Sequence, residues 1–157
     1  MARQLWLLRH GEAEPHDARD DDADRRLTPR GEEQSRAAGR ALAALELPIH
    51  VVFASPKVRA WDTAVLACQA LGVEPVEHRP LAGGFTSDEA LELVAVDGDR
   101  RTLLVGHNPD FEQVVHDLTG ARVELRKGAV AGIRVRGSRG ELMTLLQPRE
   151  LARLAGG

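Results

Sequence analysis

Short apolar runs and longer amphipathic stretches take turns along most of this chain. Continuous apolar runs are typical of strands buried on both faces, whereas apolar residues three and four positions apart are typical of helices. The expected strands span 3–8, 50–54, 73–77, 101–105, 129–135 and 141–146. The expected helices span 29–45, 56–71, 87–94 and 109–118, with a further helical turn in 148–157.

The order of these elements indicates the fold class. Alternating strands and helices are typical of an α/β domain with helices on both faces of a parallel sheet. The last two strands are joined by the short turn 137–140, so they form a hairpin and at least one of them runs antiparallel to its neighbour. We expect a three-layer α/β/α sandwich with a mostly parallel central sheet and an antiparallel C-terminal strand or hairpin. Residues 1–157 are expected to form a single domain.

Two of the expected helices have recognisable starts. Thr28 followed by Pro29, and Ser55 followed by Pro56, each place a hydroxyl residue at the N-cap and a proline at the first helical position. The second start directly follows the expected strand 50–54, so the helix beginning there leaves the end of that strand.

Composition narrows the function classes. The chain carries a formal net charge of −3, whereas nucleic-acid-binding proteins usually show a basic excess. No apolar run reaches the length of a membrane span, and no signal-peptide core precedes the first strand. The single cysteine, Cys68, lies in a helical apolar pattern and is expected to be a core residue. We expect a cytoplasmic protein with neither nucleic-acid nor membrane partners.

Unusual polar residues follow three of the expected strands. Arg9 and His10 come directly after the first strand, Arg59 lies one turn into the helix after the second, and His107 follows the strand 101–105. In open α/β sheets, sites form outside the carboxyl ends of parallel strands, so these side chains are expected to converge. Arginine forks and helix N-termini both suit phosphoryl oxygens. The pattern therefore predicts a phosphate pocket.

The two histidines suggest a mechanism for this pocket. We assign attack on phosphorus to His10, because the turn at Gly11 can bring a backbone carbonyl to one ring nitrogen and fix the tautomer. His107 is expected to act best as a cation that donates hydrogen bonds to the phosphoryl oxygens. Water then hydrolyses phospho-His10. No carboxylate accompanies the histidines at ligand spacing and nearby guanidiniums repel cations, so neither a metal nor a cofactor is expected.

The segment 12–27 has no clear periodicity and contains the acidic run 20–24. Charge runs of this kind usually form solvated loops. Because the segment follows the expected nucleophile directly, a flap over the site is the alternative, and the sequence leaves both interpretations open.

Four motifs in order resemble the histidine phosphatase superfamily, the phosphoglycerate mutase-like proteins. They are Leu-Leu-Arg-His-Gly-Glu-Ala at 7–13, Leu-Thr-Pro-Arg-Gly with a glutamine at 27–34, the Ser-Pro…Arg-Ala…Thr-Ala segment at 55–64, and Val-Gly-His-Asn-Pro at 105–109. The resemblance implies that His10 is the phosphorylated residue and that Arg9, Arg59 and His107 form the phosphate pocket. The residues of these motifs and the short length of the chain most resemble SixA-type phosphohistidine phosphatases.

One departure from the superfamily concerns the proton donor. Sugar-phosphate relatives carry a glutamate in the loop after the third strand, whereas the corresponding segment 80–85 contains no carboxylate. An imidazole leaving from a phosphoramidate can be protonated beforehand and needs no strong acid, so the difference favours a P–N substrate or an ester with a good leaving group. Glu12, Asp88 and Glu89 are the candidates if a proton donor is needed.

The resemblance implies a metal-independent phosphatase that acts on a phosphorylated protein, such as a histidine-containing phosphotransfer domain. Two alternatives stay open. A small phosphorylated metabolite, either a sugar phosphate or a nucleotide, is the second substrate class, and extra cations such as Arg30 and Lys57 near the mouth would favour it. A non-catalytic phosphate-binding domain is the third possibility.

Overall fold

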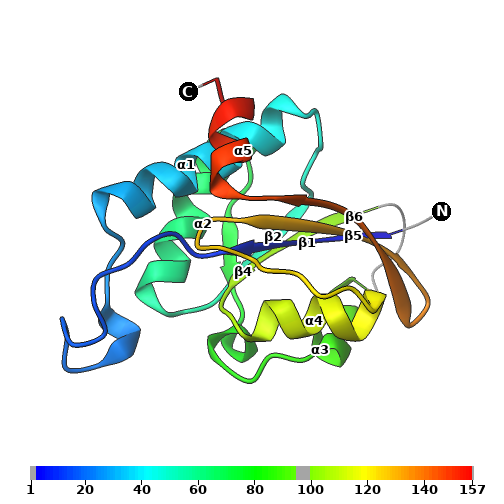
Figure 1. Cartoon of the computed structure of the whole chain (residues 1–157), viewed down its shortest axis with the longest axis horizontal. Coiled ribbons are helices and arrows are strands. Elements are labelled where there is room, and N and C mark those ends of the chain that lie inside the picture. Colours follow the sequence, from blue (N-terminus) through cyan, green and yellow to red (C-terminus); the bar gives the residue numbers. More distant parts are fainter. Residues whose placement is uncertain (1–2, 95–99, 157) are drawn as a thin grey trace.

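The computed structural model describes residues 3–94 and 100–156 of the chain. Six strands form one sheet in the order β3-β2-β4-β1-β5-β6, which crosses the middle of Figure 1. The strands are β1 (Arg3–Arg9), β2 (Val51–Ala54), β3 (Pro75–Glu77), β4 (Arg101–Gly106), β5 (Val130–Arg136) and β6 (Arg139–Leu146). The helices are α1 (Pro29–Ala44), α2 (Val58–Leu71), α3 (Ser87–Val94), α4 (Asp110–Thr119) and α5 (Pro148–Leu154), with short 3₁₀ turns η1 (Asp22–Asp24) and η2 (Arg79–Ala82).

The first four strands run parallel, and the C-terminal hairpin runs against them. β4 pairs in parallel with both β1 and β2, and β2 pairs in parallel with β3. β5 is antiparallel to β1 and to β6. The mostly parallel sheet with an antiparallel C-terminal hairpin is therefore confirmed.

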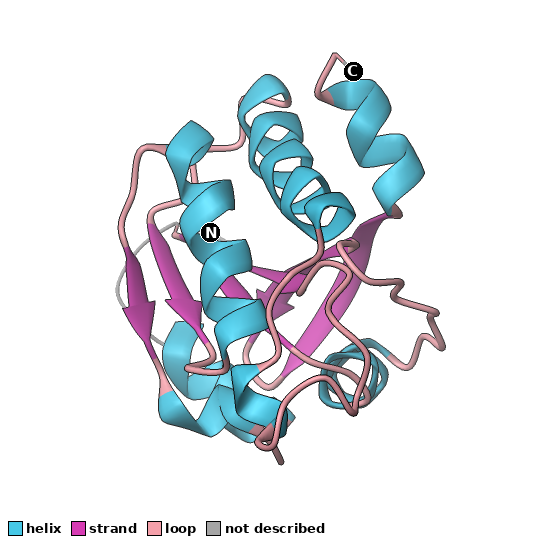
Figure 2. Cartoon of the chain, turned by 90° about the vertical axis from the view of Figure 1, so that its left-hand side faces the viewer, coloured by secondary structure: helices cyan, strands magenta, loops and turns pink. Residues whose placement is uncertain are grey.

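Helices cover both faces of the sheet, as Figures 1 and 2 show. α1, α2 and α5 lie on one face, and α3 and α4 lie on the other. On β1, Leu5 and Leu7 join the core under α3 and α4, whereas Trp6 and Leu8 join the core under the other three helices. Burial on both faces explains why this strand is a continuous apolar run, and the expected three-layer sandwich is confirmed.

The expected helix start at Ser55 is wrong by a few residues. α2 begins only at Val58, because the backbone of Lys57 is extended (φ −62°, ψ 134°). The Ser55 hydroxyl accepts the Lys57 N–H at 3.2 Å and lies 2.8 Å from a ring nitrogen of His107. Thr28, in contrast, caps α1 as expected, and its Oγ1 accepts the Gly31 N–H at 3.1 Å. The expected terminal turn is the helix α5, which ends at Leu154, and residue 157 lies outside the described residues.

Two inferences from composition can be compared with the structure. Cys68 is buried in the core, and burial raises the pKa of its thiol to about 11, so it stays protonated and inert at neutral pH. Within residues 3–94 and 100–156, we find no helix with both the length and the apolar character needed to cross a bilayer.

Candidate active site

The three polar strand ends meet at one edge of the sheet. β4 lies between β1 and β2, with Arg9 opposite Gly106 and Ala54 opposite Val105. Parallel pairing in this register brings the residues after all three strands to the same place. The ring centroids of His10 and His107 are 5.2 Å apart. The expected convergence of these segments is therefore present.

His10 is held in one orientation by the backbone around it. Its own N–H bonds to the Gly106 carbonyl at 3.0 Å, and ring atom Nδ1 lies 2.7 Å from the Gly11 carbonyl oxygen. Because a carbonyl only accepts, the ring proton sits on Nδ1 and Nε2 keeps its lone pair. Burial, aided by the charges of His107, Arg59 and Arg9, holds the pKa of His10 well below its usual 6.5, despite the opposing bond to Gly11. His10 is thus a neutral imidazole with Nε2 available, as the Gly11 turn predicted.

The turn after His10 packs directly against the start of α1. A Cβ on Gly11 would lie 2.5 Å from the Gly31 carbonyl oxygen, so only glycine fits without a shift. The Gly11 N–H donates to Thr63 Oγ1 at 3.1 Å, and Thr63 in turn donates to the Arg59 carbonyl at 2.7 Å. Thr63 therefore ties the nucleophile turn to the helix that carries Arg59. The sequence contained this threonine in a matched motif, but its partners could not be read from the pattern.

Both arginines donate to the backbone, and each keeps one nitrogen without a partner in the described part of the chain. Arg9 donates from Nη1 to the Leu125 carbonyl at 3.0 Å. Arg59, which is only 5% exposed, donates from Nη1 to the Asp22 carbonyl at 2.8 Å and from Nη2 to the Asp22 carboxylate at 3.0 Å. The Nε atom of each is buried and has no hydrogen-bond partner within residues 3–94 and 100–156. A buried donor without a partner costs about 1–3 kcal/mol, so these groups favour a ligand that accepts from them.

His107 differs from the cationic role that the sequence suggested. Burial and the charges of Arg59 and Lys57 lower the pKa of His107 to about 3, so the ring is neutral at neutral pH. Its Nε2 lies 2.8 Å from Ser55 Oγ, whereas Nδ1 is buried without a partner in the described residues. When Ser55 donates its hydroxyl hydrogen to Nε2, the ring carries its own proton on Nδ1. His107 can then donate from Nδ1 without a positive charge.

These groups surround a cavity of about 370 Å³. Its cationic lining residues are Arg9, Arg25, Lys57, Arg59 and Lys127. Among the lining residues of the described chain, Asp110 alone carries a carboxylate, and that carboxylate accepts the Phe85 N–H at 3.2 Å. No group of three histidine, cysteine, aspartate or glutamate side chains in the described chain is arranged to hold a metal ion. The surplus of positive charge suits an oxyanion.

The acidic segment 12–27 contributes two residues that the sequence pattern did not single out. Asp22, in η1, accepts from Arg25 Nε at 2.8 Å through one carboxylate oxygen and from Arg59 Nη2 at 3.0 Å through the other. Partial burial acts to raise the pKa of Asp22, but the bonds from Arg25 and Arg59 outweigh it and lower that pKa to about 2. Arg25 is itself buried and also donates to the Glu14 carbonyl at 2.7 Å. This part of the segment is therefore fastened to the site and is not only a solvated loop.

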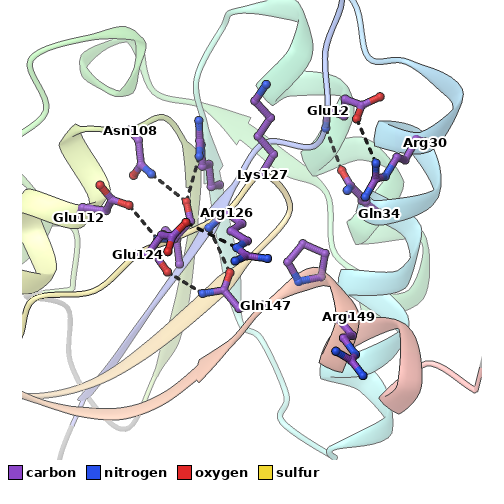
Figure 3. Close-up of a pocket in the computed structure, with 13 residues that line it drawn as sticks. Glu12, Arg30, Gln34, Asn108, Glu112, Glu124, Arg126, Lys127, Gln147 and Arg149 are labelled. Atoms are coloured by element: carbon purple, nitrogen blue, oxygen red, sulfur yellow. Dashed lines mark hydrogen bonds and ion pairs between the residues drawn. The ribbon is translucent and has the colours of Figure 1, made fainter.

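The three candidate proton donors do not line this cavity. Glu12 accepts from Thr28 Oγ1 at 2.9 Å and faces the neighbouring groove shown in Figure 3. Glu89 accepts from the Thr86 backbone near the start of α3, and Asp88 is exposed on the same helix. Asp110, which sequence reasoning missed, is the carboxylate at the cavity wall.

Similarity to known proteins covers the part of the chain that carries three of the site residues. The model of the histidine phosphatase superfamily (branch 1) matches residues 5–82, which include Arg9, His10 and Arg59. An uncharacterized protein of Picosynechococcus sp. is 32% identical over 164 residues, covering 94% of this chain and 98% of that protein.

Solved structures share the fold over nearly the whole chain. The protein histidine phosphatase SixA bound to tungstate superposes with a TM-score of 0.83 at 22% identity, covering 94% of this chain and 99% of that one. A protein from Nakamurella multipartitia, assigned as a phosphohistidine phosphatase SixA, gives a TM-score of 0.81 at 27% identity, with 94% and 97% covered. A protein of Escherichia coli, assigned as an alpha-ribazole-5'-P phosphatase, gives 0.72 at 18% identity, with 94% and 98% covered.

Proposed function

This chain belongs to the histidine phosphatase superfamily, and we propose that it removes the phosphoryl group from phosphohistidine on a partner protein by way of phospho-His10. Family membership and the SixA-like fold support phosphatase activity. One observation carries the proposal further. The free Nε2 of neutral His10 lies in a cavity with Arg9, Arg59 and His107, each of which has a buried nitrogen without a partner in the described residues.

In the first step, His10 Nε2 attacks phosphorus while the bond from phosphorus to the substrate nitrogen breaks. The substrate imidazole leaves with the electron pair of that bond. Arg9, Arg59 and His107 donate to the non-bridging oxygens, where charge is concentrated in the transition state. The Gly11 carbonyl stabilises the positive charge that His10 acquires, because it accepts from Nδ1–H. In the second step, water attacks phospho-His10, the Nε2–P bond breaks with its electrons returning to the ring, and inorganic phosphate leaves.

The placement of carboxylates supports a P–N substrate over an ordinary ester. An alkoxide leaving group needs a proton, whereas an imidazole protonated beforehand leaves as a neutral ring. Glu12, Asp88 and Glu89 lie outside the cavity lining, and the Asp110 carboxylate is occupied by the Phe85 N–H. A poor leaving group such as an alkoxide would therefore have no free carboxylic acid among the described cavity residues to protonate it.

A small phosphorylated metabolite is the second candidate substrate. Lys57 and Lys127 line the cavity beside the arginines, and this arrangement suits a ligand with a second anionic group. The cavity of about 370 Å³ also has room for more than a single phosphoryl group.

The test compares kcat/KM of the purified chain for a phosphohistidine-bearing protein, a sugar phosphate and an aryl phosphate. We expect the phosphohistidine protein to be preferred, and His10→Ala to reduce turnover on the order of 10⁴-fold or more, as removal of a covalent nucleophile does. Rapid quenching should trap an acid-labile phosphoenzyme in the parent chain and none in His10→Ala. His116→Ala, which removes an exposed imidazole on α4, is the matched control. Full activity of His10→Ala contradicts the mechanism, and a preference for the sugar phosphate contradicts the substrate.

A further inference from the structure

A second hollow, of about 690 Å³, opens beside the His10 cavity. Arg9, Asn108 and Lys127 line both hollows, so they are neighbours along one wall. Figure 3 shows this groove between the start of α1, the start of α5 and the segment 124–127. A molecule whose phosphoryl group occupies the His10 cavity therefore has this groove as an adjoining surface.

The groove is positively charged on a chain that is negative as a whole. The formal charge of the chain is −3. The cationic lining residues outnumber the carboxylates by five to three; they are Arg9, Arg30, Arg126, Lys127 and Arg149 against Glu12, Glu112 and Glu124. Two of the carboxylates pair with groove cations, Glu12 with Arg30 at 3.6 Å and Glu124 with Arg126 at 3.5 Å, and Glu112 accepts the Leu125 N–H at 2.8 Å. These pairs leave a surplus of two positive charges in the lining. The net field over the groove therefore favours an anionic ligand.

One wall of the groove is built by side-chain bonds to an irregular backbone segment. The Leu125 carbonyl accepts from Arg9 Nη1 at 3.0 Å and from Asn108 Nδ2 at 2.9 Å. Gln147 holds the other side of the segment: its Oε1 accepts the Arg126 N–H at 3.1 Å, and its Nε2 donates to the Glu124 carbonyl at 2.6 Å. Figure 3 shows these bonds converging on the segment. The wall that carries Arg126 and Lys127 is thus ordered before any ligand arrives, which lowers the cost of binding.

The exposure of these cations indicates what kind of anion fits. The side chains of Arg30 and Arg126 are 73% and 68% exposed, and Arg149 is also exposed. Arg9 and Arg59 line one cavity, whereas these three arginines stand on three separate segments. A single phosphate needs converging, buried donors, whereas dispersed exposed cations suit carboxylates spread over a surface.

We propose that this groove docks an acidic stretch of the protein that carries the phosphohistidine. The proposal rests on the proposed function, because the phosphohistidine must occupy the His10 cavity while its acidic neighbours lie along Arg30, Arg126 and Arg149. The groove then selects the partner, and the cavity performs the chemistry.

Two synthetic phosphohistidine peptides of equal length test the proposal, one with glutamates flanking the phosphohistidine on both sides and one with glutamines. We expect KM for the glutamate peptide to be about tenfold lower at low salt, and this preference to fade as NaCl is raised. The double variant Arg126→Glu with Arg149→Glu should remove the preference, while turnover of free phosphohistidine stays unchanged.

A matched control makes the same charge change at the opposite edge of the sheet. Arg136 and Arg139 flank the β5–β6 turn, where Val135 pairs with Arg3 at the start of β1. Arg136→Glu with Arg139→Glu should keep the preference for the glutamate peptide.

The outcomes separate the docking proposal from the function it rests on. Equal KM for the two peptides, or a preference that survives Arg126→Glu with Arg149→Glu, overturns the docking proposal and leaves the function standing. Failure to hydrolyse either peptide or free phosphohistidine, with an aryl phosphate still turned over, overturns the proposed function and the assigned occupant together. If the double variant changes KM only for a small bisphosphate, the groove binds a second phosphate group and not an acidic protein segment.

Discussion

The two hollows at this sheet edge use the same residue types in opposite ways. In the His10 cavity, the Arg59 side chain is 6% exposed and both of its terminal nitrogens are held by Asp22. In the groove, the Arg126 side chain is 68% exposed and pairs with a neighbouring glutamate at 3.5 Å. A buried charge with a free donor is expensive unless an anion binds it, whereas an exposed pair is worth about 0–1 kcal/mol. The comparison suggests chemistry in the cavity and recognition in the groove.

Arg9 links the two regions. Its Nε is buried without a partner in the described residues, and its Nη1 donates to the Leu125 carbonyl in the groove wall. A ligand that shifts the segment 124–127 therefore acts on one of the two guanidiniums of the proposed reaction site.

The largest expected effect is the difference in kcat between two single variants, one lacking an arginine of the cavity and one lacking an arginine of the groove. Arg59→Ala should lower kcat for free phosphohistidine by about 10²–10³-fold, because one donor to the transition-state oxygens is lost. Arg126→Ala should change the same kcat less than about twofold, since an exposed cation mainly affects encounter. Steady-state kinetics of both variants, with circular dichroism to verify folding, measures this. Similar losses in the two variants would contradict the division between chemistry and recognition.

The burial of His107 predicts a pH effect on stability. Its pKa is about 3 in the folded chain and near 6.5 when unfolded, so the unfolded state binds more protons between these values and stability rises with pH across that window. Replacing the ring by His107→Gln should remove up to about 2 kcal/mol of the stability difference between pH 5 and pH 7. Urea unfolding of the parent chain and the variant at both pH values measures this difference. An unchanged slope would show that the pKa of His107 is the same in the folded and unfolded chains.

Asp22 offers a smaller test, because its carboxylate binds the guanidinium of Arg59 that we propose as a phosphate ligand. Asp22→Asn should lower the inhibition constant of inorganic phosphate by roughly tenfold, since one negative charge leaves the site. Asp20→Asn, an exposed aspartate in the same segment, is the control. An unaltered inhibition constant would mean that Asp22 positions Arg59 without competing for it.

Chelation should have the smallest effect. Excess EDTA is expected to leave turnover within error of the untreated chain, because the cavity places arginines and lysines where a metal site would need anionic ligands. The measurement is activity before and after dialysis against EDTA, followed by addition of Mg²⁺. Loss of activity with recovery on Mg²⁺ would contradict the metal-independent mechanism.

Much of this site could be predicted because its principal residues follow strands whose pairing is predictable. His10 and His107 come directly after buried parallel strands, and Gly11 marks the turn whose carbonyl orients His10. Arg59 follows from the same logic, although its helix begins later than predicted because Lys57 is extended. These are local signals combined with one rule about sheet edges.

What escaped prediction depends on contacts between distant segments. One aspartate in an acidic run cannot be singled out until the fold places Asp22 against Arg59. The neutral state of His107 follows from burial and from neighbours 48 and 50 positions away, Arg59 and Lys57. Likewise, Arg30, Arg126 and Arg149 form a groove only because α1, α5 and the segment 124–127 are side by side in the fold.

The position of His10 and His107 at the ends of central strands has a consequence for local opening. β1 and β4 each have hydrogen-bonded neighbours on both sides, and their amides are expected to exchange with solvent only when the whole domain unfolds. Asp22 belongs instead to a single 3₁₀ turn in an irregular loop, which can open at much lower cost. Separating Asp22 from Arg59 therefore requires only this turn to open, while the imidazoles stay anchored at the ends of central strands.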